Sequence, residues 1–396
     1  MSEAPTSDVD VLIAGAGLVG LALAPAVATA GLGVALCDRS SVVVPPEPAG
    51  DDDWDARVYA ISPGSAGFLR TIGAWQALPP ERIAAVESMR VVGDDGGTLN
   101  FSAYDVGERA LAWIVEERAL RSTLVPLMRA SHAAVHAPRA VSSVEWTVER
   151  GQVHFDDGGV LDARLIVGAD GLRSPMREAA GIAATPKPYG QVAVVANFSC
   201  EHSHRGRAHQ WFTADGGVLA WLPLPGRRVS IVWSAPEALA QELLALDSAA
   251  FSARVAEAGG RALGELECIT PAAAFPLQFL KPASVVANRL ALVGDAAHGI
   301  HPLAGQGVNL GFGDVAALVA ILRERGPVTD PGERVLLERY ARRRAGPVEA
   351  MQTVTDGLAH LFRLRAPVAR SVRNLGLAAL ERMPPARRLL AYSALR

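Results

Sequence analysis

Three short glycine-containing segments, spread over the whole chain, limit most strongly what it can fold into. They begin at Gly15, Gly168 and Leu292 and read GAGLVG, GADG and LVGDAAH. A single GxGxxG segment such as the first is a weak signal, but the set of these three different segments, in this order and at these separations, is a specific one. Together they predict that remote parts of the chain build one nucleotide-binding site.

The first segment follows a predicted strand (9–14) and opens a predicted helix (18–30). In that context Gly15 permits a tight turn, Gly17 lets the backbone approach a pyrophosphate, and Gly20 lets the helix pack closely on the strand. The N-terminal end of the helix also attracts the phosphate charge. We therefore expect a dinucleotide at this turn.

A second predicted strand (34–37) ends beside this turn. Asp38 follows it and can accept hydrogen bonds from ribose hydroxyls, and Arg39 is a further candidate contact. The uncharged run 11–37 would also suit a membrane span by hydropathy alone. Its glycines divide it instead into strand, helix and strand, as in a buried parallel sheet. The first glycine segment and Asp38 do not distinguish NAD from FAD.

The third segment does distinguish them. Asp295 follows Gly294 after a predicted strand (289–293), where its carboxylate can hold the hydroxyls of a ribityl chain, which FAD has and NAD lacks. The helix that follows (308–325) would point its free amides at the pyrimidine edge of an isoalloxazine, which is negative in reduced flavin. The candidate residues at this helix start are Gly305, Gln306, Gly307, Val308 and Asn309. The prediction is an FAD site.

Three further residues are candidate cofactor contacts. Asp170, in the middle segment, can support the pyrophosphate and offers a surface for a passing nicotinamide donor. Arg57 either contacts the cofactor or pairs with Asp53 or Asp55. Arg118 either contacts the cofactor or pairs with a residue one turn along its own helix. The sequence leaves both alternatives open.

Asp295, His298 and His301 lie three residues apart, so a metal site has to be weighed. Gly299 and Pro302 argue against the continuous helix that would align them. We therefore predict no metal. His298, His301 and Pro302 are loop candidates near the isoalloxazine, and a histidine that braces this loop is favoured over a catalytic acid or base at position 301.

Composition excludes several classes of protein. A net charge of −3 over 396 residues argues against a nucleic-acid partner. Half of the residues are hydrophobic, which is enough for more than one hydrophobic core. The three cysteines are widely spaced and form no CxxC pair, which argues against a disulfide framework or zinc knuckle. The N-terminus lacks a basic secretory segment, so we expect a cytoplasmic protein.

Periodicity predicts an α/β fold in which a Rossmann-like FAD-binding domain is built from non-contiguous segments. Alternation over 191–233 predicts an inserted antiparallel-sheet substrate domain that roofs the site, and single helices are expected at 62–75 and 237–257. Pro25 is expected to kink the first helix. The expected division is FAD-binding at 1–80, 106–185 and 283–345, substrate domain at 81–105 and 186–282, and C-terminal helices at 346–396.

The chain resembles the UbiH/UbiF/VisC/COQ6 group of FAD-dependent ubiquinone-biosynthesis hydroxylases, which are para-hydroxybenzoate-hydroxylase-like flavoprotein monooxygenases. The resemblance runs along nearly the whole chain. It rests on Asp38, on DARVYAIS from Asp55, on IVEER from Ile114, on DG at Asp170, and above all on GDAAHGIHPLAGQGVNLG from Gly294. The chain departs from the family pattern at Glu117, where members usually carry a small polar amide.

The resemblance implies a reaction class. NAD(P)H or another electron donor reduces FAD, molecular oxygen adds to give a C4a-hydroperoxide, and a hydroxyl group passes to a phenol ring that bears a polyprenyl tail. The flavin supplies the difficult chemistry, so the protein positions, desolvates and polarises.

A polyprenylated phenol is strongly retained in lipid, at ~0.8 kcal/mol per buried methylene. The enzyme therefore meets its substrate at a membrane surface or receives it from a partner, such as a quinone-synthesis complex. The C-terminal arginines suit anionic headgroups at the inner face of the cytoplasmic membrane. Alternatively they form a solvated helix face with ion pairs to Glu349 and Glu381.

The sequence also allows two other functions. A soluble hydroxylase of small aromatic acids would need a cationic anchor in its cavity, for which Arg207 and Arg228 are candidates. A flavin-bound assembly factor of a quinone-synthesis complex would have no turnover at all.

Overall fold

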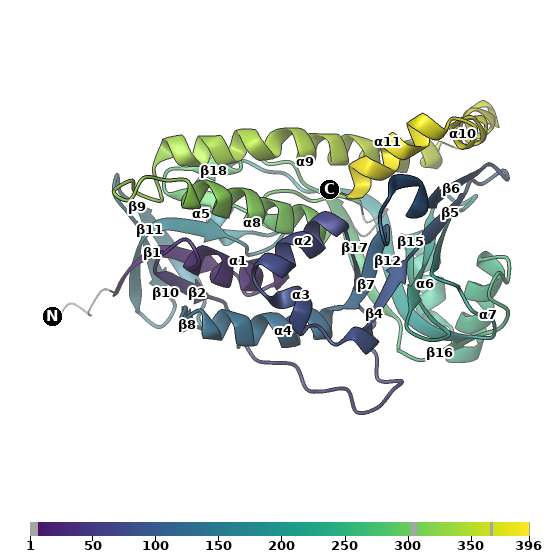
Figure 1. Cartoon of the computed structure of the whole chain (residues 1–396), viewed down its shortest axis with the longest axis horizontal. Helices are drawn as coiled ribbons and strands as arrows, with labels where there is room; N and C mark the ends of the chain where they lie inside the picture. Colours follow the sequence, from purple (N-terminus) through teal and green to yellow (C-terminus); the bar gives the residue numbers. More distant parts are fainter. Residues whose placement is uncertain (1–6, 302–306, 365–366, 396) are drawn as a thin grey trace.

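A parallel sheet forms one half of the molecule (Figure 1). The structure, a computed structural model, describes residues 7–301, 307–364 and 367–395. The parallel strands lie in the order β19–β11–β1–β2–β8; β18 pairs antiparallel with β19, and β10 and β9 continue antiparallel from β11. The bounds are β1 Ser7–Ala14, β2 Val34–Cys37, β8 Ala134–His136, β9 Val141–Trp146, β10 Gly151–Phe155, β11 Val160–Gly168, β18 Val286–Ala287 and β19 Leu290–Leu292.

Both faces of this sheet are covered, which explains why its strands are apolar throughout. Val11 and Ile13 of β1 enter the core under the helices, whereas Leu12 and Ala14 enter a second core with Phe155 of β10. The helical layer comprises α1 Leu18–Ala28, α4 Glu117–Ala130, α8 Gly307–Arg323 and α9 Arg334–Arg363, with the short α5 Pro175–Ala179 elsewhere in this half.

The first helix confirms the interpretation of the uncharged run as strand, helix and strand. α1 is buried from Leu21 to Val27 because it lies between the sheet and its neighbours α4 and α8. The helix continues through Pro25 to Ala28, and Thr29 N donates to the Pro25 carbonyl. The missing amide of Pro25 therefore does not end the helix.

The second half is built on another sheet, in the order β16–β12–β15–β14–β13–β5–β6, with β17 also paired to β12. All pairings in this sheet are antiparallel except that of β13 with β5, which is parallel. The sequence predicted a purely antiparallel sheet and therefore not this parallel pair. The bounds are β5 Ser88–Val92, β6 Thr98–Ser102, β12 Lys187–Cys200, β13 Arg207–Phe212, β14 Val218–Leu224, β15 Arg228–Pro236, β16 Leu266–Cys268 and β17 Ala273–Phe279.

Two helices, α6 Glu237–Ala245 and α7 Ser248–Ala258, cover one face of this second sheet. The expectation of a single helix over 237–257 is wrong, because Asp247 starts a new one. Its carboxylate accepts a hydrogen bond from Ala250 N at 2.8 Å, as an N-cap does.

A third, small sheet joins the two halves, and we did not predict it. Its order is β3 Val58–Ile61, β7 Ala112–Glu116, β4 Ile83–Val86. The helix expected over 62–75 also divides, into α2 Pro63–Thr71 and α3 Ala74–Ala77, because Gly73 adopts φ +76° between them. Single 3₁₀ turns lie at η1 Pro80–Arg82, η2 Tyr104–Val106 and η3 Gly294–Ala296.

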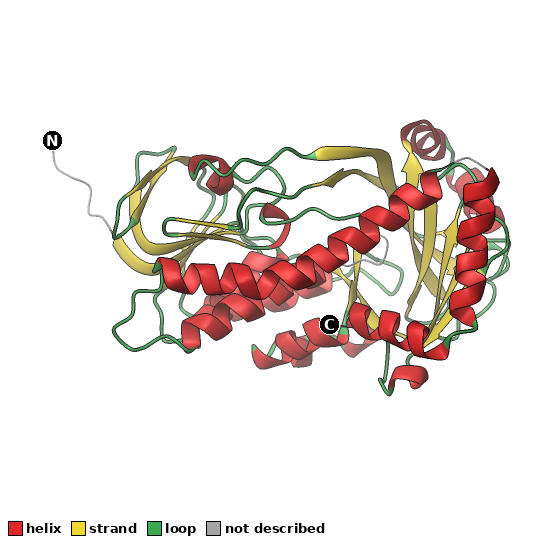
Figure 2. Ribbon diagram, turned by 90° about the horizontal axis from the view of Figure 1, so that it is seen from above, coloured by secondary structure: helices red, strands yellow, loops and turns green. Residues whose placement is uncertain are grey.

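The C-terminal helices connect the halves on the outside. α9 runs from the parallel sheet to the second sheet (Figure 2), where its Phe362 stacks on Phe212 of β13. α10 Pro367–Glu381 then lies against β6, and α11 Pro384–Leu395 lies near η2. No helix within the described ranges has the length and apolar character needed to cross a bilayer.

Candidate functional site

The three glycine segments meet at one edge of the parallel sheet. Ala14, the last residue of β1, pairs with Gly168 of β11 on one side and Cys37 of β2 on the other. Gly168 in turn pairs with Leu292 of β19. All of these residues end their strands, so the loops that follow leave from neighbouring points at the carboxyl edge, where open α/β sheets bind ligands.

The glycines of the first segment lie where a side chain would not fit. A Cβ on Gly15 would collide with the carbonyl of Ala169, and a Cβ on Gly20 would collide with the carbonyl of Gly15. By contrast, a Cβ on Gly17 or on Gly307 would meet no atom within 4 Å. Two glycines thus allow close packing, and the other two border open space at the starts of α1 and α8.

Asp38 lies beside this turn, as predicted, and already binds two backbone amides. Its carboxylate accepts from Ala16 N and Ser40 N, both at 2.7 Å. A carboxylate has about four acceptor positions, so ribose hydroxyls remain compatible with these bonds. Arg39 is exposed. Arg121 of α4, which the sequence analysis missed, reaches the same turn and donates to the Ala16 carbonyl at 3.1 Å.

Asp170 follows β11 and is only partly satisfied. One carboxylate oxygen accepts from Met176 N at 2.9 Å, whereas the other, Oδ1, is buried with no hydrogen-bond partner among the described residues. Burial raises the pKa of this carboxyl. An acceptor left unpaired in this way costs free energy unless a donor outside the chain completes it.

Asp295 lies on η3, directly after β19. Its side chain is accessible, yet desolvation by the surrounding protein raises its pKa, while His298 and Arg57 act in the opposite direction. The carboxylate is thus placed to bind hydroxyls that enter from outside the chain.

A buried triad holds the Asp295 turn, and sequence reasoning missed two of its members. Asp314 of α8 is buried and accepts from Gly294 N at 2.9 Å, and its Oδ2 lies 2.6 Å from His298 Nε2. Arg344 of α9 donates from Nε to the other oxygen at 2.6 Å. Because of these contacts, the pKa of His298 is raised, despite burial, and that of Asp314 is lowered.

The signal for this triad was visible in the sequence. Asp314 is an acidic residue between Phe312 and Val315, on the apolar face of a predicted helix. Acidic residues are rarely buried unless they are paired. The position therefore called for a basic partner elsewhere in the chain.

His301 fastens the same loop to the second sheet. Its Nε2 lies 2.8 Å from Gln191 Oε1 of β12, and its ring meets that of Tyr189 edge to face at 4.9 Å. Gly299 forms a bridge with Leu280, just beyond β17. His298 and His301 therefore contact different partners, Asp314 and Gln191. Within the described ranges, no group of three or more metal-binding side chains occurs.

The start of α8 contributes its backbone to the site, and the side chain of Asn309 there has a structural role. Val308 is buried, and the Asn309 side chain donates to the Ala60 carbonyl at 2.7 Å and accepts from Ser62 N at 2.9 Å. The amide of Asn309 thus fastens the start of α2 to α8. Pro302, Gly305 and Gln306, which we also predicted near the isoalloxazine, lie outside the described residues.

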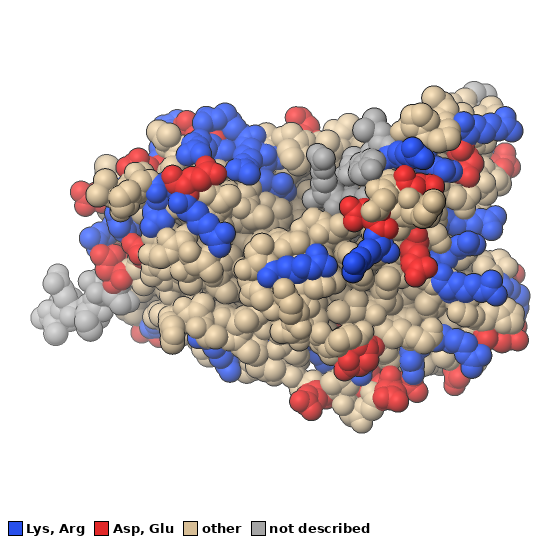
Figure 3. Space-filling model, in the orientation of Figure 1, with Lys and Arg blue, Asp and Glu red and all other residues tan. Residues whose placement is uncertain are grey.

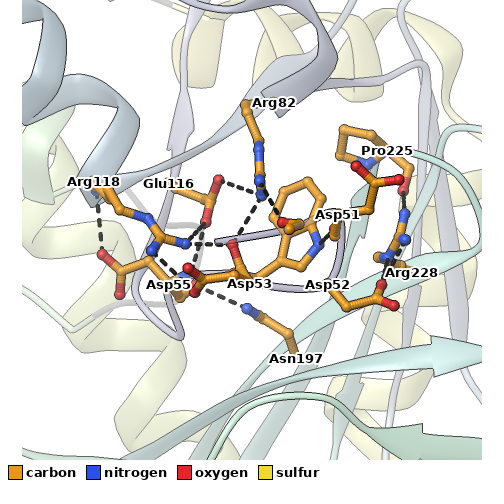
Figure 4. Close-up of polar contacts among 12 residues, drawn as sticks. Asp51, Asp52, Asp53, Asp55, Arg82, Glu116, Arg118, Asn197, Pro225 and Arg228 are labelled. Carbon is orange, nitrogen blue, oxygen red and sulfur yellow. Dashed lines mark hydrogen bonds and ion pairs between the residues drawn. The ribbon is translucent and has the colours of Figure 1, made fainter. Parts of the chain in front are cut away.

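An acidic loop at residues 50–55 closes over the junction of the two halves (Figure 4). Arg118 of α4 pairs with the Asp53 carboxylate at 3.0 Å and also donates to the Asp53 carbonyl. The buried Glu116 accepts from Asp55 N at 2.6 Å and lies 3.4 Å from Arg82. The alternative of a partner one turn along α4 for Arg118 is therefore wrong.

The same loop also binds the second sheet. Arg228 pairs with Asp52 at 2.6 Å, and Asn197 of β12 donates to the Asp55 carbonyl at 2.8 Å (Figure 4). Arg207 is exposed and donates to Ser88. An anchor for a small aromatic acid would have to be an unpaired cation inside a cavity. Neither Arg207 nor Arg228 meets this requirement.

The Arg57 guanidinium pairs with Glu117 at 3.1 Å, whereas Asp55 accepts a hydrogen bond from the Arg57 backbone N at 2.9 Å. Its guanidinium lies over the rings of Phe275 and Tyr59, at 5.1 and 5.7 Å from their centres. About half of the side chain is exposed, and Asp295 is close enough to influence its pKa. Arg57 thus lies near Asp295.

These features together fit a dinucleotide with a polyol chain: two bordering glycines, an unpaired buried acceptor and a desolvated but accessible carboxylate. Over residues 8–355 the chain matches the FAD binding domain family. The chain belongs to this family. The chain is accordingly an FAD-dependent monooxygenase, in agreement with the similar proteins described next, which are named as hydroxylases.

The similarity to known proteins extends over nearly the whole chain. The chain is 39% identical to ubiquinone hydroxylase UbiL of Rhodospirillum rubrum, over 98% of this chain and 89% of the relative. It is 33% identical to 3-demethoxyubiquinol 3-hydroxylase of Escherichia coli, over 96% of each. The fold also matches the crystal structure of Klebsiella pneumoniae HpxO complexed with FAD and uric acid, with a TM-score of 0.74, 18% identity and coverage of 97% of each chain.

Proposed function

We propose that this protein hydroxylates the ring of a polyprenylated phenol in ubiquinone biosynthesis. The observation that carries the proposal is the convergence of Gly17, Asp170 and Asp295 at one sheet edge. The names of the two similar hydroxylases support the substrate class. The ion-paired state of Arg228 argues against a small aromatic acid.

In this proposal, bound FAD would supply the redox chemistry by which electrons from NAD(P)H or another donor activate molecular oxygen; one oxygen atom would enter the ring and the other would leave as water. Gly15, Gly17 and Gly20 with the α1 amides accommodate the pyrophosphate, Asp38 and Arg39 the ribose side, and Asp295 the ribityl hydroxyls. Asp170, Arg57 and Arg118 line or close the site. Gly307 and Val308 direct the amides of α8 at the flavin ring.

The remaining residues of the site hold its loop in place through contacts with other parts of the protein. Asp314 holds the Gly294 amide, and His298 and Arg344 hold Asp314. Gln191 and His301 connect the loop to the second sheet. These contacts fix the turn against which the cofactor lies and help to exclude water from it.

The experiment supplies the purified, FAD-loaded protein with NAD(P)H, ¹⁸O₂ and a phenol that carries one isoprene unit in detergent. We expect one ¹⁸O atom in the ring of the product, and none in reactions without NAD(P)H. Oxidation of NAD(P)H with no labelled product over a range of such phenols would contradict the proposal. A flavin-loaded protein that neither oxidises NAD(P)H nor labels any of these phenols would instead favour an assembly factor of a quinone-synthesis complex.

We also propose that the outer face of α10 meets an anionic membrane surface. Val372 and Leu375 are 60% and 69% exposed at helical spacing, and Met383, just beyond the helix, is 54% exposed. Arg382, next to Met383 in the sequence, and Arg388 of α11 are also exposed. Figure 3 shows basic side chains next to uncharged ones at the end of the molecule where Figure 1 places α10 and α11.

Not every C-terminal arginine is available for such a contact. Arg387 pairs with Asp105 at 3.0 Å and with Glu381 at 3.5 Å. Glu349, which we weighed as an arginine partner, pairs with Lys281. Among the described arginines of α10, α11 and the turn between them, Arg382 and Arg388 are exposed and lie outside these ion pairs.

Val372→Asp together with Leu375→Asp is expected to weaken sedimentation with anionic liposomes about 100-fold, because two apolar contacts of at least ~1.5 kcal/mol each are lost. FAD content should not change. Val328→Asp with Val335→Asp, which alters two exposed valines elsewhere, is the matched control. Equal sedimentation of both double variants would exclude this face as the contact.

A further inference from the structure

The second sheet turns one face to α6 and α7 and the other to the proposed FAD site. Val194 of β12 belongs to the apolar cluster under these two helices. On the opposite face of the same strand, Gln191 contacts His301, and Asn197 donates to the Asp55 carbonyl of the acidic loop. We call this second surface the site face.

A row of side chains crosses the site face over four neighbouring strands. Its members, which lie directly opposite one another, are Val195 of β12, Val232 of β15, Ala220 of β14 and Gln210 of β13. The pairing of β12 with β15 has no shift in register, so Val195 shares the face of Gln191 and Asn197. We call these four residues the middle row.

Apolar clusters cover the site face on both sides of the middle row. Phe212 and Ala208, two residues to either side of Gln210 in β13, share its face. Phe212 packs with the end of α9, and Ala208 packs with Trp54 of the acidic loop. Among the described residues, neither cluster includes a member of the middle row, whose two central residues are partly exposed. The middle row therefore offers apolar surface that neither cluster covers.

Gln210 is the polar end of the middle row. Its side chain is only 6% exposed, yet its amide forms no hydrogen bond with any residue that the structure describes. A side-chain amide has two N–H donors and a carbonyl acceptor, and burial without partners costs free energy. Buried polar groups in native proteins nearly always have partners, so the amide points to a partner outside the chain.

The chemistry of this amide selects a neutral oxygen. Arg207 and Arg228, on β13 and β15, already bind Ser88 and Asp52, so they offer no free charge to a carboxylate beside Gln210. A phenol hydroxyl can donate to the amide carbonyl or accept from its N–H groups. The ring that bears the hydroxyl would then contact the apolar side chains next along the row.

We infer that Gln210 positions the phenol hydroxyl of the substrate, while the ring lies against Val232 and Ala220. The inference rests on the proposed function, since it takes a phenol as the substrate. Gln210 is thereby a specificity-determining residue. It favours a ring with a neutral hydroxyl over a ring with a carboxylate or with no oxygen at all.

Gln210→Met tests the inference, because methionine is also long and unbranched but cannot replace the hydrogen bonds of the amide. Two ligands with one isoprene unit are compared: a phenol, and the same compound without its hydroxyl. Their Kd values are measured on the oxidised, FAD-loaded protein from the change in flavin absorbance. We expect the wild type to bind the phenol about 10-fold more tightly than the other compound, and the variant to bind both within about twofold of one another. The FAD content and the Kd of the compound without hydroxyl should not change.

Gln152→Met, the same substitution on β10 of the other sheet, is the matched control. It removes the bond of Gln152 to Asp162 and should change neither Kd. A wild-type protein that binds the two compounds equally would overturn the role of Gln210, whatever the variants do. A Gln210→Met protein that keeps the wild-type preference for the phenol would overturn it as well. Because binding is measured without turnover, both outcomes are distinct from an absence of ¹⁸O in the product, which would overturn the proposed function.

Discussion

Asp295→Ala is expected to leave the protein folded and largely free of FAD. The carboxylate is accessible, desolvated and adjacent to the turn at Gly294, so its loss removes acceptors for ribityl hydroxyls. Hydrogen bonds to a charged group contribute ~1.5–3 kcal/mol each, and the loss of two raises the Kd for FAD about 100-fold or more. Titration of the apoprotein by flavin fluorescence measures this Kd.

Asp162→Ala is the control for this experiment. Asp162 lies in β11 of the same sheet and binds Gln152, but it sits six residues before Gly168, roughly 20 Å from the carboxyl edge. We expect FAD binding of this variant to equal that of the wild type. An Asp295→Ala protein that binds FAD as tightly as Asp162→Ala would show that the ribityl chain lies elsewhere.

Asp314→Ala is expected to cost about 3–5 kcal/mol of unfolding free energy, the usual range when one partner of a buried ion pair is removed. Three groups lose their partner at once: the Gly294 amide, His298 and Arg344. Because Gly294 precedes Asp295, affinity for FAD should fall as well. Urea unfolding of the apoprotein measures the first effect without the contribution of the cofactor.

Glu324→Ala is the matched control, because Glu324 links the end of α8 to Arg339 of α9 through an ion pair that is about half exposed. Exposed pairs contribute roughly 0–1 kcal/mol, so the change should be small. Equal losses of stability in the two variants would contradict the assignment of Asp314 as the centre of the buried network.

The cofactor edge of the fold was predictable because its signals are local. Gly15 and Gly20 tolerate no side chain for reasons that the strand–turn–helix context supplies. Asp295 follows a strand of three buried residues, and the end of that strand determines the edge of the sheet at which the aspartate lies. Each inference needed only a few consecutive residues and a known backbone geometry.

The partners of charged side chains were not predictable in the same way. Arg118 binds Asp53 and Arg344 binds Asp314, from segments far away in the sequence. Such pairs depend on how the halves of the molecule pack, and many acidic residues compete as candidates. Sequence reasoning could recognise that Asp314 needed a partner, but it could not choose Arg344.

Two element boundaries were missed although the chain signalled them. Asp247 precedes Ser248 with the spacing of an N-cap, and Gly73 is a residue that readily adopts positive φ. Apolar periodicity continued across both positions and concealed the breaks. The small sheet of β3, β7 and β4 was missed for another reason, since its strands are short and pair across the two halves.

The most direct test is a crystal structure of the protein with FAD. We predict ribityl hydroxyls within about 2.5–3.0 Å of the Asp295 carboxylate. We also predict that the pyrophosphate lies against the backbone at Gly17, between the C-terminal end of β1 and the N-terminal end of α8. An isoalloxazine ring beneath Gln191 and His301 would complete the agreement. FAD bound away from the carboxyl ends of β1, β11 and β19 would contradict the site on which everything else depends.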